Sequence, residues 1–164
     1  MKKLVLCYNQ TMKETVKLEI IPGLADFLIS HKTLTMANSI DKKGTIHAAA
    51  MLYFCTIDPL KFYLITSRNT DKYNLLKTHK SIQCAVVVGT EKGTPYSIQM
   101  RGDLQEIETS NNKKIIKDYY KKSNNKYDDI NDPMNCLLEF TPTWARYLDY
   151  SNGCNKYYLN LNQK

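Results

Sequence analysis

The sequence predicts a mainly β domain, in which about six antiparallel strands close into a barrel covered by two or three helices. Three observations predict this fold class. Short segments rich in β-branched and aromatic residues recur along the chain, turn residues separate them, and helical patterns interrupt the runs of strands. The chain has 164 residues, of which 43% are hydrophobic. This is enough for one domain with its own core and too short for two.

The first half begins with a helix and continues as an antiparallel meander. An amphipathic segment spans residues 15–31, but Pro22 and Gly23 interrupt it, so the helix is predicted to begin after Pro22. The spacing of hydrophobic residues then changes from a helical to a strand period. Turn residues, such as those at 41–44 and Asp58-Pro59, separate the strands. Strands are predicted over residues 33–40, 45–54 and 60–66.

The second half contains two further helices and the remaining strands. Asn69 or Thr70 can cap a short helix that turns Tyr73, Leu75 and Leu76 inward. A polar helix over 111–122 has a buried stripe made of Ile115, Ile116, Tyr119 and Tyr120. The other segments have strand patterns, and the run that ends at Gly89 is apolar enough to be buried on both faces. These strands are predicted over 82–88, 96–107, 136–140, 144–150 and 156–161.

The chain is strongly basic, with a formal net charge of +7 and an isoelectric point near 9.1. Such a charge can attract nucleic acid or an anionic membrane. However, only Arg68, Arg101 and Arg146 are arginines, and arginine is the residue that best recognises phosphates and guanine edges. We therefore expect a solvated lysine surface with no nucleic-acid or membrane partner. A small anionic ligand would still be attracted by this field.

Several other classes of site are not expected. The five cysteines are widely spaced and form no C-x-x-C pair, which argues against a disulfide framework or a zinc site. His31, His47 and His79 have no acidic partner at ligand spacing, so no metal site is predicted. The chain has no P-loop, G-x-S-x-G or G-x-G-x-x-G motif. Its apolar runs are too short for a signal peptide or for the roughly 20-residue span of a membrane helix, which predicts a cytoplasmic protein.

One segment has chemistry that suits a phosphate group. Between residues 64 and 72 a predicted strand ends and a helix begins. The hydroxyls of Thr66, Ser67 and Thr70, the ammonium of Lys72 and the free amides of the helix N-terminus would converge there. The alternative is ordinary helix capping by Asn69 or Thr70, with Lys72 in solvent. Both interpretations remain open at the level of the sequence.

An ordered set of short segments runs through residues 31–107. The segments are HK (31–32), TLTMA (33–37), HAAAMLYF (47–54), FYLITS (62–67), TDKY (70–73), AVVVG (85–89) and SIQMRG (97–102). In order and spacing this set resembles the FMN-binding, Greek-key split barrel of the pyridoxamine 5'-phosphate oxidase-like superfamily. Residues 139–149 resemble the last barrel strands of that family. The resemblance covers about half of the chain.

The resemblance implies a homodimer with FMN at the subunit interface. The oxidases have Ser-Arg-Lys where this chain has Thr70-Asp71-Lys72, and they use it to hold the FMN phosphate. Here Asp71 replaces the arginine, and the strand that carries an arginine and a lysine in the oxidases offers only His47 and an apolar run. Pyridoxamine phosphate oxidation is therefore not predicted.

The cofactor-binding residues that this resemblance implies lie on several predicted strands and on the 64–72 segment. They are His47, Met51, Tyr53, Thr66, Ser67, Thr70, Lys72, Gln99 and Trp144. Core packing explains Met51 equally well, and Trp144 could serve in the core or at a dimer interface. No catalytic residue is assigned.

The function expected from the resemblance is that of an FMN-dependent oxidoreductase, similar to a flavin reductase. It would act on an unidentified small-molecule substrate, with a nicotinamide nucleotide as electron donor. The alternative is a non-catalytic module that binds flavin or haem on the same barrel. A basic nucleic-acid binder is a third possibility, and the even spread of the lysines argues against it.

Overall fold

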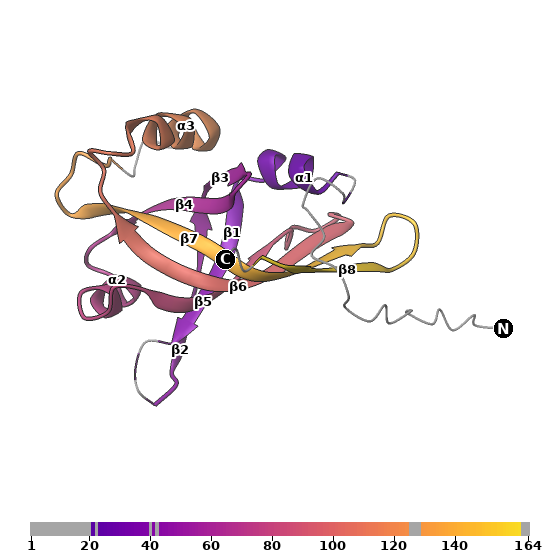
Figure 1. The fold of residues 1–164 in the computed structure, drawn as a ribbon, viewed down its shortest axis with the longest axis horizontal. Coiled ribbons are helices and arrows are strands. Elements are labelled where there is room, and N and C mark those ends of the chain that lie inside the picture. Colours follow the sequence, from indigo (N-terminus) through magenta and orange to yellow (C-terminus); the bar gives the residue numbers. More distant parts are fainter. Residues whose placement is uncertain (1–20, 22, 40, 42, 125–128, 162–164) are drawn as a thin grey trace.

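The computed structural model describes residues 21, 23–39, 41, 43–124 and 129–161, which form three helices and eight strands (Figure 1). The chain order is α1 (Leu24–Ser30), β1 (Thr33–Ser39), β2 (Ile46–Leu52), β3 (Phe54–Ile57), β4 (Leu60–Ser67), α2 (Asp71–Leu76), β5 (Ile82–Val88), β6 (Tyr96–Ile107), α3 (Lys113–Ser123), β7 (Asn135–Asp149) and β8 (Asn155–Asn160). The predicted mainly β class is confirmed. No helix of the described residues is long and apolar enough to cross a membrane.

All eight strands belong to one antiparallel sheet with the order β2-β1-β5-β6-β7-β4-β3, and β8 pairs with β7. The two ends of this path, β2 and β3, are separated in the chain by Tyr53 alone. The segment that leaves one edge of the sheet therefore begins the other edge, and the sheet curls into a barrel. The Tyr53 amide, at this junction, donates a hydrogen bond of 3.0 Å to the carbonyl of Lys32.

The prediction of about six strands is wrong in number, because the sheet has eight, and the boundaries of the predicted strand segments also differ from the observed ones at two places. The predicted strand 45–54 is divided at Tyr53 into β2 and β3. Conversely, the predicted strands 136–140 and 144–150 form one strand, β7, which continues through Pro142. Proline lacks the N–H group that a strand ladder uses, but the pairing of β6 with β7 changes register between Arg101 and Gly102, where Gly102 lies opposite Pro142.

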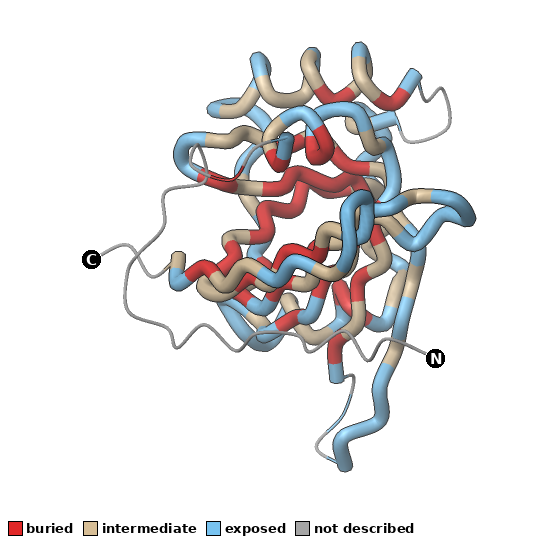
Figure 2. The backbone as a smooth tube through the Cα atoms, turned by 90° about the vertical axis from the view of Figure 1, so that its right-hand side faces the viewer, coloured by how far each residue is buried: buried red, intermediate tan, exposed pale blue. Residues whose placement is uncertain are grey.

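The main core lies inside the curled sheet and beneath α1. In Figure 2 the buried backbone lies at the centre of the molecule, and the exposed backbone at its margins. The inward side chains come from every second residue of the central strands, and α1 adds Leu24, Phe27 and Leu28. As predicted, α1 begins after Pro22, and Gly23 at its start has a positive φ of 76°.

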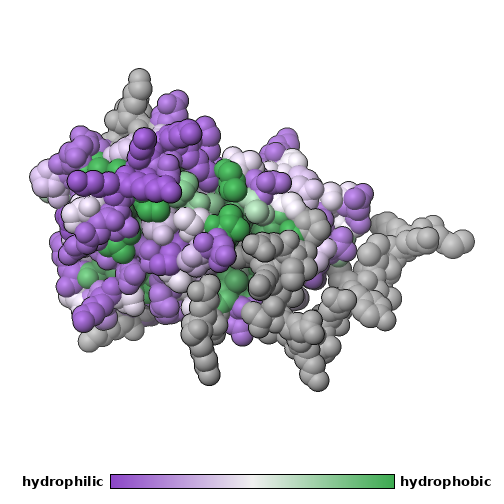
Figure 3. All heavy atoms as spheres, turned by 45° about the horizontal axis from the view of Figure 1, so that its top comes forward, coloured by the Kyte–Doolittle hydropathy of each residue, from purple (hydrophilic) through white to green (hydrophobic). Residues whose placement is uncertain are grey.

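The helix α3 covers a second, smaller core on the outside of the sheet. Tyr119 of α3 is fully buried against Tyr63 and Ile65 of β4 and Leu137 of β7. The other members of the predicted stripe, Ile115, Ile116 and Tyr120, are half-buried against the same cluster, which confirms the stripe. The part of the surface where α3 lies is largely hydrophilic in Figure 3, with hydrophobic side chains in separate areas. The outward face of α3 is thus a solvated one.

One carbonyl oxygen connects α1, α3 and the junction between β2 and β3. The Leu28 carbonyl accepts hydrogen bonds from the Tyr53 hydroxyl at 2.7 Å and from Lys122 Nζ at 3.1 Å. Lys122 Nζ also lies 3.9 Å from the centroid of the Tyr53 ring. Burial raises the pKa of the Tyr53 hydroxyl well above its usual range. The hydroxyl therefore keeps its proton at every physiological pH and donates this hydrogen bond.

Replacing Tyr53 with phenylalanine is expected to lower the free energy of unfolding by about 1–2 kcal/mol. The variant removes a buried donor from the Leu28 carbonyl while Lys122 still donates to it. Urea unfolding measures the change, and Tyr150→Phe serves as the matched control because Tyr150 is 50% exposed. Equal stability of the two variants would show that the buried hydroxyl contributes nothing.

Candidate functional site

The junction between β4 and α2 brings four of the predicted binding residues together. Lys72 Nζ donates to Thr66 Oγ1 at 3.2 Å, and Thr70 Oγ1 donates to the Ser67 carbonyl at 2.9 Å. Ser67 Oγ accepts the Asn69 amide at 3.1 Å. Thr70 occupies the N-cap position of α2, but its side chain makes no capping hydrogen bond. The polar groups of this loop therefore bind one another, and among the described residues no side chain caps the first amides of α2.

Lys72 has an environment that the sequence did not predict. Its side chain is 5% exposed and extends toward the barrel interior, where Thr66 and the thiols of Cys84 and Cys136 are its neighbours. Burial lowers the pKa of its ammonium, and the neighbouring groups only partly oppose this effect. The interpretation of Lys72 as a solvated lysine is therefore wrong. Its assignment as a phosphate ligand stays a prediction, and it would need the ammonium to turn outward.

The outer face of the sheet presents two rows of side chains that run across the strands. Residues that lie directly opposite in antiparallel strands point to the same side, so the register defines each row. One row consists of Ala48, Ala37, Ala85, Arg101, Trp144 and Asn160. The next row consists of Ala50, Thr35, Val87, Gln99, Arg146 and Tyr158. The intervening residues, such as Met36, Val86 and Met100, are buried in the core.

Half of this surface carries only small side chains. We call it the alanine face and define it as Ala37, Ala48, Ala50 and Ala85. Three of these residues are exposed, and Ala37 is half-buried. A surface of methyl groups on a continuous sheet allows close approach by a planar ring or by another sheet. Gln99 and Trp144, two of the predicted cofactor residues, continue the same two rows and border this face.

Three other predicted residues point to the opposite side of the sheet. His47 lies across from Asn38, and Met51 lies across from Leu34, both of which are buried. His47 and Met51 therefore face inward and do not share a side with Gln99 and Trp144. Tyr53 is fully buried with its hydroxyl bound to Leu28. The nine predicted residues thus lie in three separate places.

Two arginines on the outer face were missed as site residues. Arg101 lies beside Gln99 in β6, and Arg146 lies beside Trp144 in β7, each at a spacing of two residues. The guanidinium carbon of Arg101 is 4.4 Å from the centroid of the Trp144 ring, and Arg146 donates to Gln99 Oε1. The available signal was the alternation of polar residues in SIQMRG and TWAR, which places both pairs on one face.

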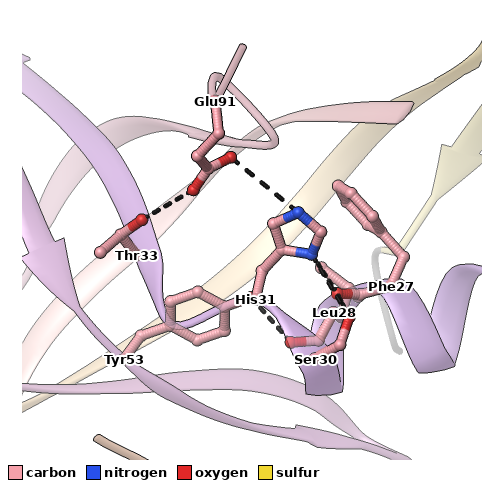
Figure 4. A network of polar contacts seen from close by, with 7 residues as sticks. All are labelled: Phe27, Leu28, Ser30, His31, Thr33, Tyr53 and Glu91. Atoms are coloured by element: carbon pink, nitrogen blue, oxygen red, sulfur yellow. Dashed lines mark hydrogen bonds and ion pairs between the residues drawn. The ribbon is translucent and has the colours of Figure 1, made fainter. Parts of the chain in front are cut away.

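A separate polar network joins the end of α1 to the turn between β5 and β6 (Figure 4). His31 Nδ1 is 2.8 Å from the Phe27 carbonyl, and Nε2 is 3.9 Å from Glu91. Thr33 Oγ1 donates to the other carboxylate oxygen at 2.9 Å. Burial raises the pKa of Glu91, but hydrogen bonds from backbone amides and Thr33 outweigh it, so the pKa is lowered.

His31 therefore has an acidic partner, Glu91. The spacing of motifs could not reveal this partner, because Glu91 lies far along the chain. The described residues contain no group of three His, Cys, Asp or Glu side chains that could hold a metal ion. Within those residues the network is a structural contact between α1 and the sheet.

Several solved structures have a fold similar to that of this chain. No protein-family model matches the chain, and no curated protein matches it. Among solved structures, it is similar to a protein related to general stress protein 26 of the pyridoxinephosphate oxidase family from Clostridium acetobutylicum, with a TM-score of 0.60 and 16% identity over 83% of this chain and 90% of that one. A pyridoxamine 5'-phosphate oxidase-related, FMN-binding protein from Nostoc punctiforme gives 0.60 and 13% over 86% and 91%.

A third similar structure is a haem-binding protein from Mycobacterium smegmatis, with a TM-score of 0.60 and 12% identity over 80% of this chain. The chain spans about half, 54%, of the length of that protein. Identities this low establish the fold alone. The chain therefore has the split-barrel fold of the pyridoxamine 5'-phosphate oxidase-like proteins.

Proposed function

We propose that the chain forms a homodimer, binds FMN in the groove between the two copies, and acts as an FMN-dependent oxidoreductase in the cytoplasm. The substrate is a small molecule, and a nicotinamide nucleotide is the electron donor. The alanine face is the observation that carries this proposal. It is an exposed sheet surface of small side chains on a barrel whose fold an FMN-binding protein shares.

The residues present suit a flavin in two respects. The alanine face lets a planar ring approach the backbone of β1, β2 and β5, and the Gln99 amide and the Trp144 ring lie at its border. The β4–α2 loop offers the half-exposed hydroxyls of Ser67 and Thr70 and uncapped amides for an anionic tail. Bound FMN would supply the redox chemistry, while these residues would bind and orient it.

The alanine face also suits packing against a second copy of the chain. Ile46 is 65% exposed at the start of β2. It points to the same side as the alanine face because it lies two residues before Ala48 in the same strand. Packing of this face against a second copy would bury Ile46 and would enclose a ring between the two sheets. A charge introduced into the face would oppose both events.

An absorption spectrum of the purified protein provides the first test. FMN has bands near roughly 370 and 450 nm, and bleaching of these bands by NAD(P)H supports the oxidoreductase. A flavin spectrum that NAD(P)H leaves unchanged favours a non-catalytic flavin module. A Soret band favours the haem alternative, for which the similarity to a haem-binding protein is the supporting observation. A colourless protein that takes up no added FMN contradicts the proposal.

Replacing Ala48 with glutamate is expected to lower FMN affinity by about tenfold or more and to shift the protein toward monomer, because a buried charge has no partner on this face. Fluorescence titration with FMN and analytical ultracentrifugation measure the two effects. Thr109→Glu is the charge-matched control, since Thr109 is exposed and lies outside the strands. If the two variants behave alike, the alanine face is not the interface.

A further inference from the structure

We propose that Arg101, Arg146, Gln99 and Trp144 form a second ligand site, which binds the phosphate group of a nucleotide other than FMN. We call these four residues the arginine site. The existence of the site does not depend on FMN, but its assignment to the nicotinamide electron donor rests on the proposed function.

The strand pairing places the two arginines on one face of the sheet. Arg101 lies directly opposite Trp144, and Gln99 lies directly opposite Arg146, so the four side chains form a block on the outer side of β6 and β7. The guanidinium groups therefore extend from neighbouring strands on the same face. Two planar guanidinium forks can together bind several oxygens of one phosphate, which is a geometry that lysine cannot reproduce.

Neither arginine has a carboxylate partner among the described residues. The ion pairs of the described residues join His31 to Glu91, Lys61 to Glu139 and Arg68 to Glu106, and neither arginine of the site takes part in one. The acidic residue next along the strand, Asp103, accepts a hydrogen bond from Gln83. Both positive charges are thus uncompensated within the part of the chain that the structure describes.

The hydrogen-bond donors of Arg146 are only partly used among the described residues. Its one side-chain hydrogen bond among the described residues goes to the neutral amide of Gln99, and its buried Nε has no partner there. A buried donor without an acceptor costs about 1–3 kcal/mol, so the fold alone does not account for this arrangement. An anion that draws the guanidinium away from Gln99 would give Nε an acceptor.

The aromatic part of the ligand follows from the stack of Arg101 on Trp144. The guanidinium carbon lies 4.4 Å from the ring centroid, and Arg101 itself is exposed. The side of the guanidinium that faces away from Trp144 can therefore stack against a second flat ring. A phosphate held by the arginines and a base stacked on Arg101 together describe a nucleotide.

Calorimetric titration of the protein as purified with AMP, NADP⁺ and inorganic phosphate tests the site. Trp144 is the only tryptophan, so its fluorescence reports directly on the same site. We expect AMP and NADP⁺ to bind and to change this fluorescence, and inorganic phosphate to bind more weakly. Binding of phosphate as tight as that of AMP would overturn the nucleotide assignment, and no binding of any of the three would overturn the site.

Variants separate this site from the flavin site. Arg101→Ala and Arg146→Ala are each expected to weaken AMP binding by about tenfold, and Arg146→Lys is expected to recover only part of the affinity. Lys113→Ala, which removes an exposed charge from α3, is the control. FMN affinity should fall much less than AMP affinity in all of them, because Gln99 and Trp144, which border the alanine face, are kept. A parallel loss of FMN affinity, or competition between FMN and AMP, would show that the arginines hold the FMN phosphate and would overturn the proposal.

Discussion

Replacing Gly102 with alanine is expected to lower the free energy of unfolding by about 3 kcal/mol, because the added methyl group would collide with backbone. A Cβ at this position would lie 2.1 Å from the Thr141 carbonyl oxygen and 2.6 Å from the Pro142 Cα. Neither atom can move without shifting β7 away from β6. Gly102 also marks the register change between these strands, where Arg101 is paired with Trp144 and Gly102 with Pro142.

The consequence extends to the outer face of the sheet. If β7 moves, Trp144 and Arg146 move relative to Gln99 and Arg101, so the variant should also weaken nucleotide binding at the arginine site. Urea unfolding followed by Trp144 fluorescence measures the stability. Gly93→Ala is the comparison, since Gly93 has a positive φ of 86° but nothing within 4 Å of an added Cβ, and we expect it to lose only about 1 kcal/mol. Equal losses would mean that the contact with Thr141 is not what requires glycine.

The sequence predicts those elements whose signals are local. The start of α1 after Pro22 follows from the fixed φ of proline and its missing amide, and the stripe of α3 follows from helical spacing. The boundaries between strands could not be predicted in the same way. Pro142 indicates a break when only one strand is considered, and the register change that accommodates it depends on Gly102 in the partner strand.

In the candidate site, too, only the features with local signals could be predicted from the sequence. The four groups of the β4–α2 loop could be predicted to lie together because they are close in the chain, and they do. The side of the sheet to which each strand residue points depends on register and on the position of the core. For this reason His47 and Met51 face inward, whereas Arg101 and Arg146, which carried no motif, share the outer face with Gln99 and Trp144.

Replacing Lys72 with methionine is expected to raise the free energy of unfolding at neutral pH by about 1 kcal/mol or more, because a buried charge is exchanged for an apolar group of similar length. Lys72 is 5% exposed, and the one hydrogen bond described for its ammonium goes to the neutral hydroxyl of Thr66. Lys80→Met, at an exposed position, is the control and should leave the stability unchanged. A loss of stability in the Lys72 variant would show that the bond to Thr66 outweighs the cost of burial.

The contribution of Lys72 to the free energy of unfolding changes with pH in a defined direction. Burial lowers the pKa of Lys72 from 10.5 in the folded state, so between the folded pKa and 10.5 the unfolded chain binds more protons. The unfavourable contribution of Lys72 is therefore full below the folded pKa and disappears as the pH rises toward 10.5. Cys84 and Cys136 act in the opposite sense above pH 9, because burial raises their pKa to about 12 and about 11.

Below pH 9 these thiols stay protonated in both proteins, because burial raises their pKa. In that range the difference in stability between the wild type and Lys72→Met therefore reports the lysine. That difference should shrink as the pH rises, and a constant difference would contradict a lowered pKa. The same variant tests the phosphate role that the resemblance implies for Lys72. If the ammonium turns outward to hold FMN, the variant will be more stable and will bind FMN more weakly. If Lys72 stays directed at Thr66, the gain in stability will come with unchanged FMN affinity, and the hydroxyls and amides of the β4–α2 loop must hold the phosphate without it.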